Sequence, residues 1–86
     1  MKEIIFDSNS FAWVDDWYSN RFYLHHQIRL FKELIQHRGY LYLNQIYESL
    51  CIEWSPDEDN ICYRDPDTFS FDFIQDGDDK IVITIK

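Results

Sequence analysis

The longest amphipathic pattern in the chain runs from Trp17 to Arg38. Within it, apolar residues recur at i, i+4, i+7 and i+11, which is the spacing of one helix face. This stripe comprises Leu24, Ile28, Phe31 and Ile35, widened by Leu30 and Leu34. Gly39 follows at the position where a left-handed residue ends a helix. The pattern predicts a helix of about six turns that forms the centre of the core and not an active site.

Two alternatives remain open for the start of this helix. Asp15 and Asp16 would lie in its first turn, where the helix dipole favours acidic side chains. Ser19 or Asn20 would instead provide the N-cap, because their side chains accept hydrogen bonds from free backbone N–H groups.

A second pattern, alternation of apolar and polar residues, marks the C-terminal part of the chain. Three phenylalanines alternate with other residues, and three isoleucines alternate with Val82 and Thr84, as in half-buried strands. These residues are Phe69, Phe71 and Phe73, and Ile81, Ile83 and Ile85. Asp76 and Gly77 form a hairpin signal between them. The chain is therefore predicted to close with a β-hairpin, and Lys2–Phe6 is predicted as another short strand.

The middle of the chain is predicted to hold a second, shorter helix. Asn44 is a good N-cap, and apolar residues from Leu43 to Leu50 recur at helical spacing, which indicates about two turns near residues 45–51. Residues 40–43 form either a strand fragment or a tight connection. The elements together predict one α+β domain over residues 1–86. One long and one short helix pack on a small antiparallel sheet that ends in a β-hairpin, an order like that of a winged helix.

Charge is distributed unevenly along the chain. Residues 1–43 hold five acids and five bases, whereas residues 44–86 hold eleven acids and three bases, which is the whole net charge of −8. Ten acids and one base, Arg64, lie between Glu53 and Asp79. A field of one sign repels nucleic acid and anionic membranes and attracts basic partners. A solvated acidic face with no partner is the alternative.

Aromatic residues are unusually frequent, with seven Phe, six Tyr and three Trp. Each buries roughly 150–250 Å², so a few of them suffice to close the core of a small domain. Since Tyr and Trp are enriched at protein interfaces, some of these side chains are expected to contact a partner.

A winged-helix order is typical of DNA-binding proteins, yet the charges argue against that function. Residues 44–51, in the position of a recognition helix, include Glu48 and no Lys or Arg. Lys and Arg supply most non-specific DNA affinity, so direct contact with nucleic acid is not expected. With only two glycines the sequence has no glycine-rich phosphate-binding loop, and no serine lies in a nucleophile motif. An enzyme is not expected either.

Metal-ligand patterns are also missing from the sequence. Calcium loops counted from Asp57 or Asp65 lack the glycine and the glutamate that such loops require. His25, His26 and His37 are spaced poorly for joint zinc binding. No cofactor or metal is expected.

Cys51 and Cys62 are expected to be buried thiols and not a disulfide, because the N-terminus is too short and too soon charged for a signal peptide. No apolar run approaches the roughly 20 residues that cross a bilayer. A cytoplasmic location is therefore expected.

The run from Arg38 to Ile52 is similar to a pattern in small uncharacterised acidic proteins of phages and mobile elements of Gram-positive bacteria. In that family an aromatic-rich helix precedes Gly-x-x-x-Leu-Asn-x-x-Tyr-x-x-Leu-Gly-Ile/Leu, and a short acidic hairpin region closes the chain. The matching residues are Gly39, Leu43, Asn44, Tyr47, Leu50 and Ile52. Cys51 departs from the pattern, where glycine is usual. The resemblance implies no activity, but it implies a setting among inhibitors of host defence, such as anti-CRISPR and anti-restriction proteins.

The expected function is stoichiometric inhibition of a basic, nucleic-acid-binding host defence protein by nucleic-acid mimicry. The expected contacts are acidic side chains, with Trp54 or Tyr63 as an aromatic anchor: Asp57, Glu58, Asp59, Asp65, Asp67, Asp76, Asp78 and Asp79. An immunity protein or antitoxin that masks a basic toxin, or a homo-oligomeric structural or assembly protein, is the alternative. The protein itself is expected to be a monomer or homodimer without membrane contact.

Overall fold

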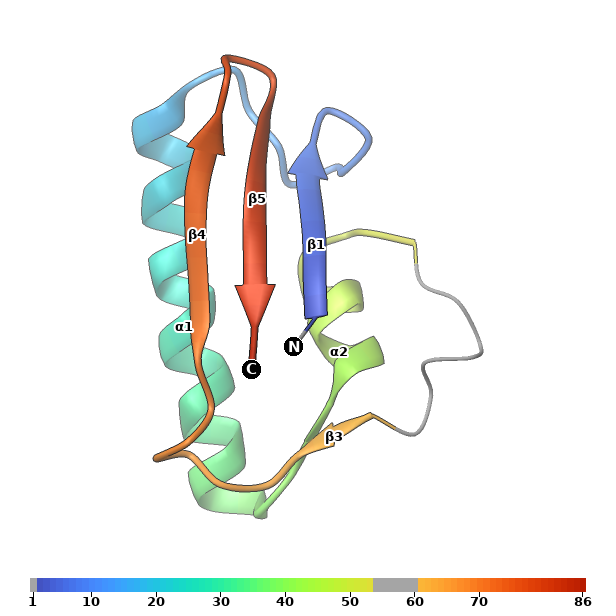
Figure 1. Cartoon of the computed structure of the whole chain (residues 1–86), viewed down its shortest axis with the longest axis vertical. Coiled ribbons are helices and arrows are strands. Elements are labelled where there is room, and N and C mark those ends of the chain that lie inside the picture. Colours follow the sequence, from blue (N-terminus) through green and yellow to red (C-terminus); the bar gives the residue numbers. More distant parts are fainter. Residues whose placement is uncertain (1, 54–60) are drawn as a thin grey trace.

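The long helix predicted between Trp17 and Arg38 has those bounds and runs along one side of a three-stranded sheet (Figure 1). The computed structural model describes residues 2–53 and 61–86. In chain order its elements are β1 (Lys2–Asp7), α1 (Trp17–Arg38), β2 (Leu41–Tyr42), α2 (Leu43–Ser49), β3 (Cys62–Tyr63), β4 (Phe71–Asp76) and β5 (Lys80–Ile85). The predicted α+β class, with a long helix, a short helix and an antiparallel sheet that ends in a hairpin, is confirmed.

The sheet brings the first and last strands of the chain together. Its order is β1-β5-β4 and both pairs are antiparallel, so β5 is central while β1 and β4 are edges. Residues 77–79 connect β4 to β5, and Gly77 has a φ of 73° there, which confirms the hairpin predicted from Asp76 and Gly77. The two-residue strands β2 and β3 form a separate antiparallel pair.

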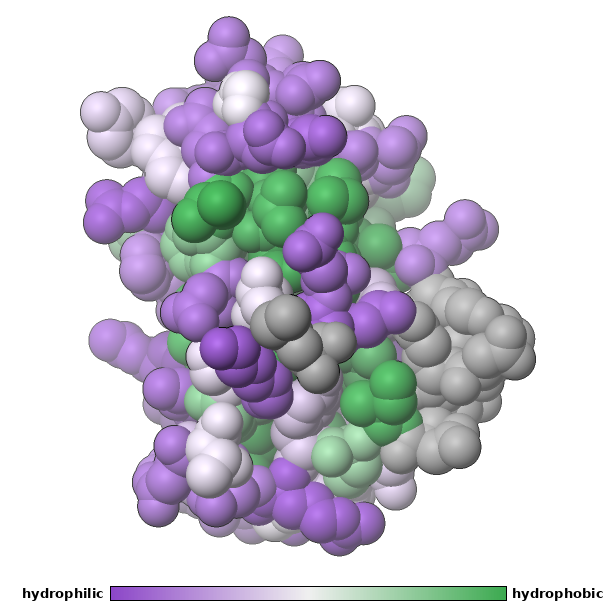
Figure 2. Space-filling view, in the orientation of Figure 1, coloured by the Kyte–Doolittle hydropathy of each residue, from purple (hydrophilic) through white to green (hydrophobic). Residues whose placement is uncertain are grey.

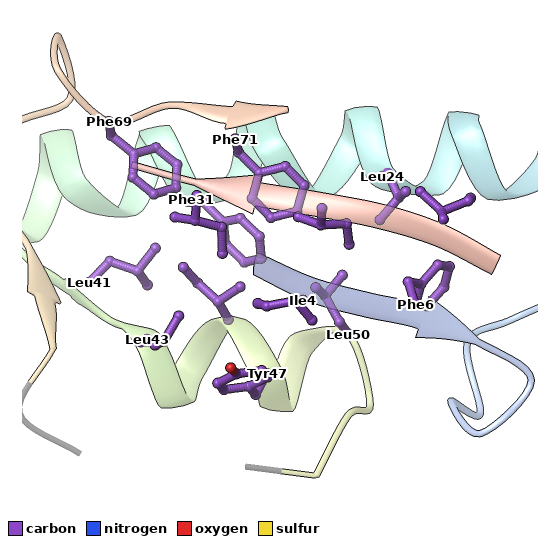
Figure 3. Packing of buried hydrophobic residues seen from close by; sticks show 14 of the residues in the cluster. Ile4, Phe6, Leu24, Phe31, Leu41, Leu43, Tyr47, Leu50, Phe69 and Phe71 are labelled. Carbon is purple, nitrogen blue, oxygen red and sulfur yellow. The ribbon is translucent and has the colours of Figure 1, made fainter. Parts of the chain in front are cut away.

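The core lies between α1 and the inner face of the sheet, and α2 adds to it beside β1 (Figure 3). The fully buried side chains come from both helices and the strands, with Leu50 at the end of α2: Phe6, Asn20, Leu24, Phe31, Ile35, Leu41, Leu43, Ile46, Leu50, Ile81, Ile83 and Ile85. The alternation predicted for β5 is therefore confirmed. The strand predicted from alternating phenylalanines begins at Phe71, so Phe69 precedes it. Phe69 and Phe71 are buried and Phe73 is half-buried.

The ends of α1 are set by local hydrogen bonds. Asp16 is the N-cap, and its carboxylate accepts a hydrogen bond from the Tyr18 backbone N–H at 3.2 Å. Neither alternative for the start holds, because no acid lies in the first turn and the predicted caps Ser19 and Asn20 lie inside the helix. At the other end Gly39 has a φ of 85° and donates its N–H to the Ile35 carbonyl at 2.8 Å. The predicted left-handed end is confirmed.

Polar side chains share the buried face of α1 with the predicted apolar stripe. Asn20 and Gln27 are buried, whereas Leu30, which was expected to widen the stripe, is exposed. Burial of these amides is possible because each has a partner: Asn20 bonds the Val14 backbone, and Gln27 accepts a hydrogen bond from the Ser49 hydroxyl. Buried polar groups are tolerated when they are paired in this way.

The short helix α2 begins earlier than predicted. Its N-cap is Tyr42 and not Asn44, which lies inside the first turn. The reason is the pairing of β2 with β3, which ends at Tyr42, together with the Gln45 side chain, which accepts a hydrogen bond from the Tyr42 N–H at 3.0 Å.

Cys51 lies just beyond α2 with a φ of 55°, a left-handed conformation that favours glycine. Its side chain is exposed, Cys62 is partly buried, and both thiols are free. The expectation of a buried thiol is wrong for Cys51, because the turn that ends α2 directs this residue out of the core.

Candidate interaction surface

The outer face of the three-stranded sheet is the most distinctive surface of the molecule. In Figure 1 α1 lies behind the strands, and Figure 2, in the same orientation, shows a hydrophobic area across the front of the sheet. The strand register identifies its residues. Ile5 of β1 lies opposite Val82 of β5, which lies opposite Ile74 of β4.

We call these three residues the apolar row. Ile5 is 41% exposed and Ile74 is 69% exposed, although both are large aliphatic side chains. Neighbouring strands are about 4.8 Å apart, so the row runs for about 10 Å across the sheet. Because successive side chains alternate between the two faces of a strand, none of the three reaches the core.

A charged row lies on each side of the apolar row, two residues away along the strands. One comprises Asp7, Lys80 and Asp76, and the other comprises Glu3, Thr84 and Asp72. We call them the acidic rows, and they lie about 13 Å apart, since two residues of a strand rise about 6.7 Å. They hold four carboxylates and one ammonium group, a formal balance of −3.

The single lysine in the acidic rows does little to offset them. Lys80 Nζ lies 3.6 Å from Asp76 Oδ2, and both side chains are largely exposed. Exposed pairs of this kind contribute about 0–1 kcal/mol and are screened by salt. Asp72 accepts a hydrogen bond from the Ser70 hydroxyl at 3.0 Å, which orients its carboxylate. The face as a whole is apolar in the middle and acidic at its margins.

The structure separates the acidic residues predicted as contacts. Asp76, Asp78 and Asp79 lie at the hairpin, and Asp65 and Asp67 lie in the connection before β4, at the opposite end of the molecule (Figure 1). Of these residues only Asp76 belongs to the acidic rows.

The remaining predicted contacts differ in how much the structure says about them. Asp65 has a local role, because its Oδ1 accepts a hydrogen bond from the Asp67 N–H at 2.9 Å. Tyr63 is half-buried, with its ring edge-on to Phe69 at 5.2 Å between centroids, so only part of it is accessible to a partner. Trp54, Asp57, Glu58 and Asp59 lie outside the described residues.

Sequence reasoning missed most of the outer face. In each of the three strands the residues that face the solvent are normally polar. An aliphatic residue at such a position is a signal that could have been noticed, and it occurs at Ile5, Ile74 and Val82. Their alignment into one row could not be derived, because it depends on the register of three strands.

Two hollows adjoin this face at its edges. Beside β1 a pocket of about 590 Å³ is lined by Ile5, Phe11, Ile52 and Glu53, among others, and it extends the apolar row. Beside β4 a groove of about 590 Å³ separates the strand from α1, and it is lined by Trp17, Arg21, His25, Ile28 and residues 71–75.

The described part of the chain holds neither a group of metal ligands nor a helix that could span a membrane. Within residues 2–53 and 61–86, no three His, Cys, Asp or Glu side chains come together as a metal site would require. Neither described helix combines the length and the apolar character needed to cross a bilayer. Comparison of the sequence and structure with protein-family models, with characterised proteins and with solved structures found no match.

Proposed function

We propose that this protein is a non-catalytic inhibitor that covers the basic surface of a nucleic-acid-binding protein with the outer face of its sheet. The observation that carries the proposal is the apolar row between two acidic rows. Proteins that bind nucleic acid use Lys and Arg to neutralise phosphates. Carboxylates at the margins of the sheet are complementary to such a surface, while the apolar row supplies buried contact area.

The two parts of the surface have different roles in this mechanism. Desolvated apolar side chains such as Ile74 contribute most to affinity, as at other interfaces. The carboxylates increase the association rate and exclude acidic partners. Sequence resemblance to small acidic phage proteins favours a host defence protein, such as a CRISPR or restriction enzyme, as the target, met in the cytoplasm of the bacterial host.

The test begins with affinity capture from a bacterial lysate and elution with increasing salt. The captured protein is then purified, and its binding to nucleic acid is measured with and without an equimolar amount of this protein. We expect a one-to-one loss of nucleic-acid binding that is relieved by salt, because exposed charges are screened within about 10 Å at 0.1 M salt.

Matched variants locate the contact. Asp72→Asn with Asp76→Asn removes two charges from the acidic rows, and Asp15→Asn with Glu33→Gln removes two exposed charges elsewhere. The first pair is expected to weaken binding about tenfold, since two charged contacts of up to about 1 kcal/mol each are lost, and the second pair is expected to change little. Equal effects of the two pairs, or an affinity that ignores salt, would refute the proposal.

A second candidate is a homo-oligomeric assembly protein. It is favoured by exposed aromatic rings on the outward side of α1, Tyr18 and Phe22, which are 74% and 77% exposed. Light scattering separates the two functions: a stable oligomer that dissociates with Phe22→Ser would support assembly over inhibition.

A further inference from the structure

The outer edge of β4 carries backbone groups that β5 does not use. Ser70 and Lys86 exchange two hydrogen bonds, at 3.2 and 2.9 Å, and so form a hydrogen-bonded pair at the end of the β4–β5 ladder. In antiparallel sheets such pairs alternate with pairs that exchange none. From this register Asp72, Ile74 and Asp76 direct their N–H and C=O groups to β5. Phe71, Phe73 and Gln75 therefore direct theirs outward.

No described strand pairs with that outward edge, and its sequence holds neither proline nor lysine. Natural edge strands are commonly blunted by proline, by a bulge or by charged side chains, lysine above all. The register of β4 shows no bulge, and its charged side chains, the two aspartates, point over the outer face and not along the edge. Gln75 is exposed and Phe73 is half-buried, so the edge is open to another extended chain at these two residues, whereas Phe71 is buried.

The groove between β4 and α1 lies next to this edge. Its aromatic lining is preassembled: the Phe73 ring lies edge-on to His25 at 5.1 Å and to Trp17 at 6.3 Å between centroids. Ile28 and Phe71 add apolar surface, and Arg21 contributes a charge. A free strand edge beside a groove against a helix is the arrangement in which peptides bind by strand addition.

We infer that the edge of β4 accepts an extended, basic segment of the partner as a fourth strand of the sheet. This inference rests on the proposed function and names the element of the partner that binds. The backbone of the segment bonds to Phe73 and Gln75. Its side chains alternate between the groove and the outer face.

The positions on β4 determine which side chains fit. A residue opposite Asp72 or Asp76 lies over the outer face beside a carboxylate, so Lys or Arg is favoured. The residue opposite Ile74 continues the apolar row. Residues that point into the groove are expected to be apolar, because Trp17, Ile28 and Phe73 line it and Arg21 repels a cation, whereas the carboxylate of Asp72 points over the outer face. The preferred segment is Lys-Φ-Φ-Φ-Lys, where Φ is an apolar residue and the two cations are four positions apart.

The experiment uses a capped synthetic peptide with this pattern and the ¹⁵N-labelled protein. Amide hydrogen exchange at Phe73 and Gln75 is expected to slow by at least about tenfold at saturation, because new hydrogen bonds protect these groups. By the same alternation, the backbone N–H groups of Glu3, Ile5 and Asp7 point outward at the edge of β1, which the peptide is not expected to contact. Their exchange rates are expected to stay unchanged.

Two control peptides have the same side chains in other arrangements. With the lysines three positions apart, the two cations lie on opposite faces of the strand, so one must enter the groove. This peptide is expected to bind about tenfold more weakly, from the loss of one cross-strand pair and the burial of a charge. N-methylation at the positions that face β4 removes the backbone donors and is expected to abolish the protection.

A matched pair of protein variants gives an independent test. Gln75→Pro removes one outward N–H that the ladder does not need, as edge strands tolerate, whereas Gln75→Ala keeps it. Weaker peptide binding is expected for the proline variant alone. Should that variant fail to fold, the N-methylated peptide still decides the question.

Two outcomes overturn the inference, and they are distinct from failure of the proposed function. Equal affinity of the two lysine spacings, or unchanged exchange at the β4 edge with shifts only at Ile5, Val82 and Ile74, would show contact with the face without strand addition. In that case inhibition through the acidic rows stands. If the captured partner also ignores Asp72→Asn with Asp76→Asn, both ideas are lost.

Discussion

Asn20 is the side chain whose replacement best tests the account of the fold. It is buried in α1, and its amide makes two hydrogen bonds to one residue of the preceding connection. Nδ2 donates to the Val14 carbonyl at 2.7 Å, and Oδ1 accepts from the Val14 N–H at 3.1 Å. The pair joins the chain before α1 to the buried face of the helix.

Asn20→Ala is expected to cost about 2 kcal/mol of unfolding free energy. Each lost hydrogen bond contributes about 1 kcal/mol, and the small cavity adds to the cost. The higher helix propensity of alanine returns about 0.5 kcal/mol. Because Val14 is half-exposed, water partly replaces the lost partner. For a domain of this size the melting temperature should fall by about 8–16 °C.

Urea unfolding followed by circular dichroism measures this cost. Asn20→Asp keeps the acceptor for the Val14 N–H but loses the donor, and it is expected to be destabilised as well. Gln36→Ala, on the exposed side of α1, is the matched control and should change stability by less than about 0.5 kcal/mol. If Asn20→Ala unfolds at the same urea concentration as this control, the two hydrogen bonds do not stabilise the fold and the reasoning is wrong.

Substitutions at three further positions test local features, each by urea unfolding. Gly39→Ala should lower the free energy of unfolding by about 1 kcal/mol, because φ is 85° and the added methyl group would find no atom within 4 Å whose contact could offset the backbone strain. An unchanged urea midpoint would contradict this. Cys51→Gly should stabilise by about 0.5–1 kcal/mol by relieving the left-handed backbone at φ 55°, whereas Cys51→Val should destabilise. Tyr23→Phe removes a hydrogen bond of 2.6 Å to the Ser49 carbonyl and should cost about 1 kcal/mol. Burial, and then the charge of Cys51, raise the pKa of Tyr23. Its contribution to stability is therefore full below pH about 10 and is lost as pH rises through the raised pKa, so the variant should show a flatter alkaline decline.

The elements that could be predicted are those whose signal lies within a few residues. The 3.6-residue period and Gly39 located α1, and alternation with an Asp-Gly turn located the hairpin. The N-cap residues of the helices were harder to predict. Asp16 and Tyr42 are the N-caps, but nearby residues such as Ser19 and Asn44 are equally suitable by residue type.

The candidate site depended on information that no local window contains. A concentration of acids was visible in the sequence, but the fold sends Asp65 and Asp67 to one end of the molecule and Asp76 to the other. The carboxylates that flank the apolar row come from three strands, and two of these, Glu3 and Asp7, lie in the half of the chain with no net charge.

By itself, the sequence determined the two helices, β1, the strands of the C-terminal hairpin and the acidic balance of this protein, because backbone geometry converts side-chain spacing directly into local structure. Only the tertiary structure decided that β1 pairs with β5, and hence that Ile5, Val82 and Ile74 align. It also left the edge of β4 open beside a groove. Strand neighbours and register result from burying one common core, so a surface assembled across strands exists only once the whole chain has packed.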